Sequence, residues 1–170
     1  MKGWVWENLA RDEWKTVDRE ACGRAVESLE NVYEFLPKQL IHRDVHFGNF
    51  LFSEGELSGY IDFDLSQRNI RIFDICYFLT GLLAEEAEEA FTKKEWTENV
   101  RAAIEGYESI TRLSAEEKAA IPWVMGCIEI LFAAYFLGME DFKHAKEAWE
   151  VFLFVQDCRG DIIGSRNFRK

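Results

Sequence analysis

The sequence lacks the features that mark fibrous, repetitive or disordered chains. Of its 170 residues two are proline, and no internal repeat, Gly/Ser-rich linker or low-complexity segment is visible. This excludes a Pro-rich or low-complexity protein, because such chains need a biased composition. Nearly half the residues are apolar, so the chain can bury a substantial core. We expect residues 1–170 to form a single domain.

Paired cysteines and a secretory signal are also missing. The four cysteines are far apart and form no CxxC motif, so neither a zinc site nor a disulfide framework is indicated; they are Cys22, Cys76, Cys127 and Cys158. Their apolar neighbours predict buried thiols in a reducing compartment. The first residues carry charges where a signal peptide needs an apolar core. We therefore expect a cytoplasmic location.

Basic residues are scarce. Lysine and arginine total 20 against 31 acidic residues, which gives a formal charge of −11. This argues against nucleic-acid binding, because displacing counterions from phosphates requires a basic face. The acidic excess would suit a cationic substrate, although ordinary solubility explains it as well.

One long apolar run, residues 121–138, could be mistaken for a membrane span. Glu129 lies in its middle, Pro122 suits the first position of a helix, and charged residues follow directly. We therefore predict a central core helix beginning at Pro122 and no membrane partner.

Helical periodicity dominates the rest of the chain, whereas residues 1–15 form a lead that we expect to pack through its tryptophans. Apolar residues recur at helical spacing over 17–36, where Pro37 ends the pattern. Residues 70–83 are nearly all apolar and predict a buried helix that carries Asp74. A capping box at Thr92/Glu95 predicts a helix that runs to about Ile110, and a second capping box at Ser114/Glu117 predicts another helix start. The acidic run over 85–89 is typical of a solvated helix face. An amphipathic helix is predicted from Asp141 to Gly160.

The stretch from Leu40 to Asp74 breaks this helical pattern. Residues 50–52 and 57–63 favour strands, and the polar residues between them predict a hairpin turn. A hairpin symmetric about Gly55 and Glu56 would set Asn49 opposite Asp62. Two such oxygen ligands suit Mg²⁺, which takes few protein ligands and completes its shell with water and phosphate. Asp44 would then be left to accept or orient the proton of a hydroxyl.

Two other interpretations stay open from these residues. Asp44, Asn49 and Asp62 could be turn and cap residues, which Asp and Asn favour for their local hydrogen bonds. Alternatively, His42, Asp44 and His46 could form a transition-metal site, because alternate residues of an extended segment point the same way.

This stretch resembles the catalytic segment of the aminoglycoside phosphotransferase and choline kinase family, within the protein-kinase-like superfamily. The resemblance rests on the segments His42-Arg43-Asp44, His46-Phe47-Gly48-Asn49 and Ile61-Asp62-Phe63-Asp64. Family members usually have glycine where this chain has Arg43.

The resemblance implies a mainly α (α+β) fold: the helical C-terminal lobe of a kinase-like protein, with a small β-hairpin that carries the site. It implies Asp44 as catalytic base, Asn49 and Asp62 as Mg²⁺ ligands, and ATP as phosphoryl donor to a small-molecule hydroxyl. Asp74 would hold the catalytic loop from beneath. His42, Arg43, His46 and Asp64 would support the site, His42 most simply as a structural residue.

The same resemblance makes one absence notable. Kinase-like enzymes clamp ATP with an N-terminal lobe that contributes a glycine-rich loop and a strand lysine, and neither motif is found here. We therefore expect residues 17–158 to form the C-terminal lobe without its partner lobe. A truncated, non-catalytic binding or assembly module is the alternative, and the surface that would face the missing lobe is a candidate for self-association. The acceptor stays open among aminoglycosides, choline, homoserine and similar alcohols.

Overall fold

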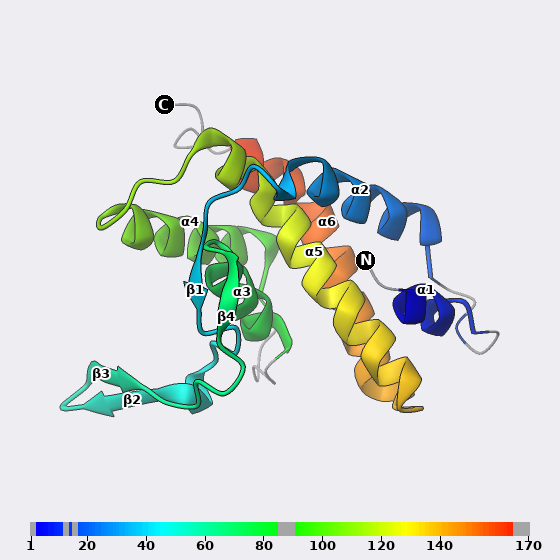
Figure 1. Ribbon diagram of the computed structural model, residues 1–170, viewed down its shortest axis with the longest axis horizontal. Helices are drawn as coiled ribbons and strands as arrows, with labels where there is room; N and C mark the ends of the chain where they lie inside the picture. The colour runs from blue at the N-terminus through cyan, green and yellow to red at the C-terminus, as the bar shows by residue number, and fades with distance from the viewer. Residues whose placement is uncertain (1–2, 12–13, 15–16, 85–90, 165–170) are drawn as a thin grey trace.

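The computed structural model describes residues 3–11, 14, 17–84 and 91–164. These residues form a helical body with two small antiparallel sheets at one side (Figure 1). The helices are α1 (Gly3–Leu9), α2 (Arg19–Tyr33), α3 (Phe73–Ala84), α4 (Lys93–Glu108), α5 (Ala115–Gly138) and α6 (Phe142–Gly164). The predicted mainly α fold with a small β part is confirmed.

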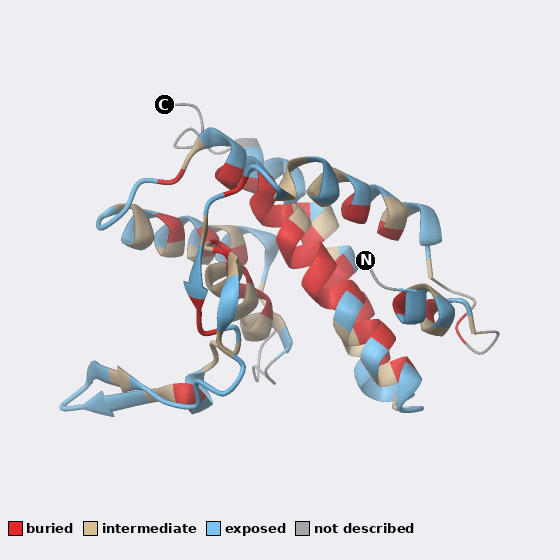
Figure 2. Cartoon of the chain, viewed as in Figure 1, coloured by how far each residue is buried: buried red, intermediate tan, exposed pale blue. Residues whose placement is uncertain are grey.

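The central element is α5, which packs against α1, α2, α3 and α6. It is buried along most of its length (Figure 2), as expected for a helix that is apolar on all sides. Its length and composition would allow it to cross a membrane, but 72% of its most apolar window is buried inside this fold. The prediction of a core helix therefore agrees with its packing.

Both capping boxes are confirmed, at Thr92/Glu95 for α4 and at Ser114/Glu117 for α5. Two boundaries were predicted wrongly. Pro122 lies inside α5, which begins a full two turns earlier, and Gly160 lies inside α6 and does not end it. In both cases packing along a long helix outweighs the local preference of a single residue.

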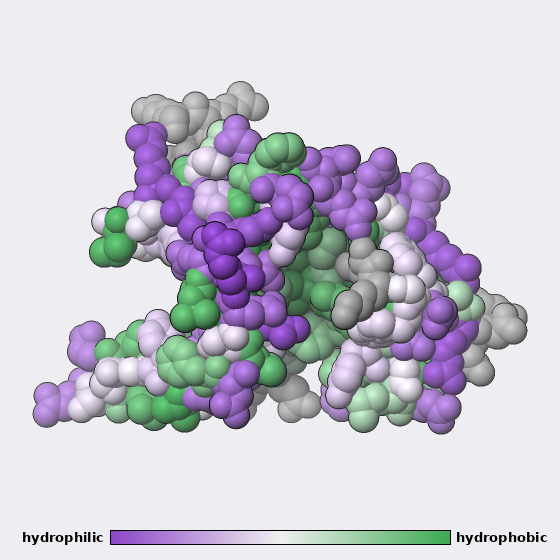
Figure 3. Space-filling model, in the orientation of Figure 1, coloured by the Kyte–Doolittle hydropathy of each residue, from purple (hydrophilic) through white to green (hydrophobic). Residues whose placement is uncertain are grey.

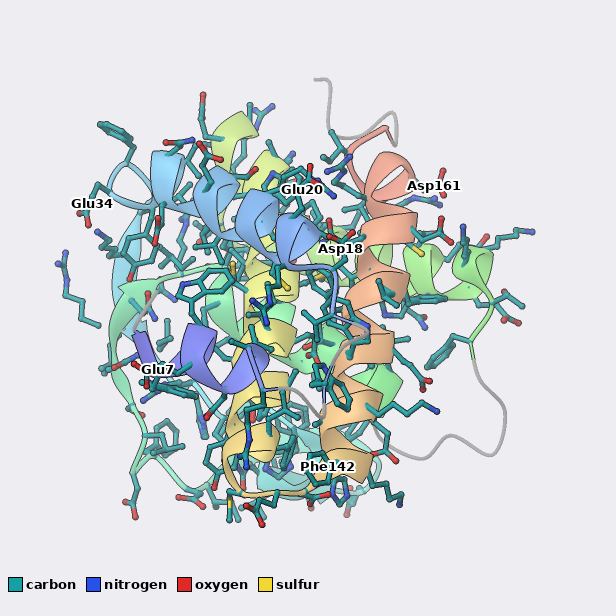
Figure 4. The ribbon with its side chains drawn as sticks, turned by 90° about the vertical axis from the view of Figure 1, so that its right-hand side faces the viewer. Glu7, Asp18, Glu20, Glu34, Phe142 and Asp161 are labelled. Atoms are coloured by element: carbon teal, nitrogen blue, oxygen red, sulfur yellow. The ribbon has the colours of Figure 1, made fainter. Side chains whose placement is uncertain are left out.

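The N-terminal segment is attached to α5 by apolar and polar contacts. Val5 and Leu9 of α1 are buried, and so is Trp14, whereas Trp4 is 40% exposed. The Asn8 side chain donates a hydrogen bond to the Ala134 carbonyl of α5. Figure 4 shows α1 lying across α5, near the side of the molecule opposite the sheets. The tryptophans thus contribute unequally to the predicted packing.

The strands differ in part from the prediction. The hairpin is present as β2 (Phe50–Ser53) and β3 (Glu56–Tyr60), although β3 ends before Phe63. A second sheet, β1 (Lys38–Ile41) with β4 (Gln67–Ile70), was not predicted. Because β4 takes up residue 70, α3 begins at Phe73 and not at residue 70 as predicted. The predicted helix over 17–36 is shorter, from Arg19 to Tyr33, and the acidic run over 85–89 lies outside the described residues.

The hairpin register was also predicted wrongly. Glu54 and Gly55 both have positive φ angles, of 53° and 85°, so they form the tight turn. Phe50 pairs with Tyr60, and the Ile61 N–H donates to the Asn49 carbonyl at 3.0 Å. Asn49 therefore lies opposite Ile61, and Asp62 is the next residue along the chain.

The hairpin extends from the body and exposes apolar side chains. Figure 3 shows hydrophobic residues gathered on it, and Phe52 and Leu57 are 56% and 46% exposed. A separate apolar groove of about 560 Å³ lies between α1, α2 and α5, with Arg43 at one edge.

Candidate active site

The loop that follows β1 is held by Asp74 in the first turn of α3. One carboxylate oxygen accepts the His42 N–H at 2.9 Å, and the other accepts the Arg43 N–H at 2.8 Å. These hydrogen bonds agree with the prediction that Asp74 holds the loop from beneath. Because both oxygens are used, the orientation of the loop relative to α3 is fixed.

Arg43 adopts a left-handed backbone conformation with φ of 76°. Side chains with a Cβ are disfavoured there, whereas glycine is not. Glycine would adopt this conformation without that cost, so Arg43 is strained at this position.

His42 connects the loop to the hairpin. Its ring is 8% exposed; Nε2 lies 2.8 Å from the Ile61 carbonyl, and Nδ1 lies 3.4 Å from the Asp44 N–H. A carbonyl requires a donor and an N–H requires an acceptor, so both contacts are satisfied when Nε2 carries the ring proton. His42 therefore joins the residue preceding Asp62 to Asp44, as a structural residue.

Asp44 accepts hydrogen bonds from two sides. The Tyr77 hydroxyl donates to Oδ1 at 2.8 Å, and the Asn49 side-chain amide donates to Oδ2 at 3.3 Å and to the Asp44 carbonyl at 2.9 Å. Burial raises the pKa of Tyr77, and its hydrogen bond to Asp44 raises it further, so Tyr77 stays a donor. The carboxylate is oriented but still partly exposed.

His46 and Gly48 shape the turn that carries Asn49. Nδ1 of His46 accepts the Gly48 N–H at 3.1 Å and caps a 3₁₀ turn (Phe47–Asn49), while Nε2 lies 3.7 Å from Asp44. A Cβ on Gly48 would lie 2.8 Å from the His46 ring. Glycine is therefore needed for the ring to cap the turn.

The two predicted metal ligands come from neighbouring backbone at the base of the hairpin, where Ile61, the residue before Asp62, donates its N–H to the Asn49 carbonyl. Asn49 is buried, and its side-chain NH₂ group donates to the Asp44 carbonyl. The Oδ1 atom of Asn49 is therefore the one that could coordinate a metal ion. Asp62 is exposed and has φ of 62°. An amide oxygen and a carboxylate fit Mg²⁺, which needs few protein ligands. Asp64 is also exposed, in a turn closed by the Ser66 N–H and the Phe63 carbonyl.

The alternative of a transition-metal site at His42, Asp44 and His46 is wrong. In the described part of the chain, no group of three His, Cys, Asp or Glu side chains could hold a metal ion. Both ring nitrogens of His42 are also occupied by backbone groups.

Asp44 borders a pocket of about 340 Å³ between α3, α5 and α6. Tyr77 and Glu129, which also line it, were not among the predicted site residues. Tyr77 could have been found, because it lies one helical turn after Asp74. Glu129 gave a weaker signal, as a lone acid within a long apolar run.

Comparison with solved structures supports a kinase-like fold for this chain. The chain is similar to an amicoumacin kinase in complex with AMP-PNP, Ca²⁺ and Ami, with a TM-score of 0.60 and 21% identity. The match covers 95% of this chain and 50% of that one. The fold is therefore that of a helical lobe of a kinase-like protein.

The profile of the phosphotransferase enzyme family matches residues 2–117. The chain belongs to this family. It is similar to a homoserine kinase from Phenylobacterium zucineum, 37% identical over 122 residues, and to one from Neisseria meningitidis, 31% identical over 143 residues. Each match covers 72% of this chain, but 32% and 43% of those relatives, so the chain spans less than half of their length.

Proposed function

We propose that this chain is the catalytic lobe of a small-molecule phosphotransferase that moves the γ-phosphoryl group of ATP to a substrate hydroxyl. The observation that supports this proposal most is the orientation of the Asp44 carboxylate and its position at a pocket. Its carboxylate is oriented by Tyr77 and Asn49 and borders a pocket large enough for a small acceptor. Membership of the phosphotransferase family agrees with the same chemistry.

In this reaction the acceptor hydroxyl lies beside Asp44. Its oxygen attacks the γ-phosphorus, the bond from that phosphorus to the bridging oxygen breaks, and ADP leaves. Asp44 takes the hydroxyl proton, and the Tyr77 hydroxyl keeps the carboxylate oriented. Asn49 and Asp62 would hold Mg²⁺, which neutralises charge on the donor phosphates.

We further propose that residues 1–170 correspond to a single unit, the C-terminal lobe of a kinase-like protein. In-line transfer needs the phosphoryl donor to be positioned as well as the acceptor. The exposed apolar hairpin, with Phe52 and Leu57, is the surface we assign to an N-terminal lobe or to a second copy of this chain. Homoserine, named by the relatives, is the first acceptor to test.

The proposal is tested by phosphoryl transfer from ATP with Mg²⁺ to homoserine and a panel of amino alcohols. We expect Asp44→Asn, which preserves shape and removes the base, to lower transfer at least about a hundredfold. Asp161→Asn is the control, because Asp161 is exposed at the far end of α6 (Figure 4). Wild-type transfer by Asp44→Asn would contradict the assignment, and so would a wild-type chain that transfers to none of the acceptors.

A further inference from the structure

The pocket beside Asp44 is built from one face of each of three helices. Residues spaced three or four apart share a helical face, and the lining residues follow this spacing. They are Tyr77, Thr80, Gly81 and Ala84 of α3, Glu129, Phe132 and Phe136 of α5, and His144, Glu147 and Ala148 of α6. The packing of these helices therefore defines a pocket with a polar end at Asp44 and His46.

The charged residues that line this pocket are mainly acidic. The described residues that line it include Asp44, Glu129 and Glu147 but no lysine or arginine. Glu147 is 45% exposed and lies 3.7 Å from Lys143, so solvent and a cation already compensate its charge. His144 lies beside Asp141, with Nδ1 2.5 Å from the carboxylate. Glu129 is different from both.

Glu129 is 3% exposed and lies in the middle of the apolar helix α5. Its neighbour Thr80 is equally buried and donates its hydroxyl to the Tyr77 carbonyl at 3.2 Å. Burial raises the pKa of Glu129 to about 7, although its contact with Thr80 acts to lower this pKa. A buried carboxylate without a cation costs folding free energy, so its presence at a pocket wall requires a reason beyond packing.

Glu129, Asp44 and Tyr77 line the same pocket. The Tyr77 hydroxyl is bonded to Asp44, and after burial and Asp44 the charge of Glu129 also contributes to the raised pKa of Tyr77. An acceptor bound in this pocket therefore shares it with both carboxylates. The aromatic rings of Phe132 and Phe136, with centroids 6.1 Å apart, line the pocket beside Glu129.

We propose that Glu129 is the specificity-determining residue of this pocket, where it binds the primary ammonium group of an acceptor whose hydroxyl faces Asp44. The inference deepens the proposed phosphotransferase function and rests on it for the role of the hydroxyl. A primary ammonium donates hydrogen bonds to Glu129 and compensates its charge in a desolvated site. A quaternary ammonium lacks these donors, and a neutral alcohol lacks the charge.

The test measures binding to the full chain without nucleotide, so that failure of phosphoryl transfer does not affect it. Calorimetry or NMR titration compares 3-amino-1-propanol with 1-butanol, its uncharged counterpart, and with its trimethylammonium analogue. We expect the primary amine to bind at least about tenfold more tightly than either, the range of one charge-assisted hydrogen bond.

Two variants assign this preference to a residue. Glu129→Gln keeps the size of the side chain and should abolish the preference, whereas Glu147→Gln at the rim of the same pocket should keep it. If Glu129→Gln does not fold, Glu129→Asp retains the charge and should still prefer the primary amine. Equal binding of the three probes, no binding of the amine, or a preference that persists in Glu129→Gln would overturn the proposal.

Discussion

At the scale of single residues, the site depends on side chains that each make two hydrogen bonds. Asp74 accepts two loop N–H groups, His42 joins Asp44 to Ile61, and Asn49 donates twice to Asp44. Residues that act in this way leave little freedom to the loop. The exception is Arg43, whose backbone conformation carries a cost that none of these hydrogen bonds removes.

Arg43→Gly tests this cost. Because φ at this position is 76°, we expect glycine to raise the free energy of unfolding by about 0.5–1 kcal/mol, measured by urea titration. Arg68→Gly is the control: Arg68 is an exposed arginine in strand β4, and glycine there should destabilise. A loss of stability in Arg43→Gly equal to that in Arg68→Gly would show that the left-handed conformation carries no strain.

At the scale of elements, the loop, the hairpin and α3 act as one unit. The Asp74 carboxylate lies in the first turn of α3 and fixes the loop that follows β1. His42 then fixes the end of β3 to that loop. Movement of α3 would therefore displace Asp44 and the residue that precedes Asp62 together.

Asp74→Asn should uncouple these elements. An asparagine has one acceptor oxygen, so its NH₂ group must face one of the two loop N–H donors. We expect a loss of about 2–3 kcal/mol in the free energy of unfolding by urea titration. Asp18→Asn is the matched control, because Asp18 accepts the Ala21 N–H as a helix N-cap, where asparagine is equally good. Similar losses in both variants would contradict the coupling.

The sequence predicted the helical elements better than the strands, for physical reasons. Capping boxes and helical periodicity are local signals, and Thr92 and Ser114 marked two helix starts correctly. The β1–β4 sheet joins strands that lie far apart in the chain and have no strong β-favouring run, so local pattern could not reveal it. The hairpin register depended on which residues take positive φ, and Glu54 did so unexpectedly.

The sequence singled out residues of one loop and its support, but not the contacts that this loop makes with the helices. Asp44, Asn49 and Asp74 were identified from spacing and resemblance, and their hydrogen bonds join them in one loop. Tyr77 and Glu129 were missed, because their relation to Asp44 arises from the packing of α3 against α5. Such contacts between helices are not encoded in any local motif.

At the scale of the whole molecule, Glu129 is a costly group in the core. Glu129 has a pKa of about 7 in the folded protein against 4.5 for an ordinary glutamate. At a pH between these two pKa values, Glu129 is protonated in the folded protein and ionised in the unfolded chain. The free energy of unfolding therefore falls as pH rises through this window, and the full penalty of about 3 kcal/mol is present above pH 7.

Glu129→Gln should remove this dependence. We expect the variant to match the wild type near pH 4.5 and to be more stable by about 3 kcal/mol near pH 8, measured by urea unfolding at both values. The other ionisable side chains around the pocket, Asp44, His46, Tyr77, His144 and Glu147, are present in both proteins. A difference independent of pH would mean that Glu129 is not held neutral by burial.

The central claim is that Asn49 and Asp62 together hold a divalent cation at the base of the hairpin, beside Asp44. NMR line broadening by Mn²⁺, used as a paramagnetic substitute for Mg²⁺, tests it without any need for nucleotide or activity. The account predicts broadening centred on residues 44, 49 and 62 that Asp62→Asn removes and that excess Mg²⁺ reverses. Broadening centred elsewhere on the acidic surface, or unchanged in Asp62→Asn, would contradict it.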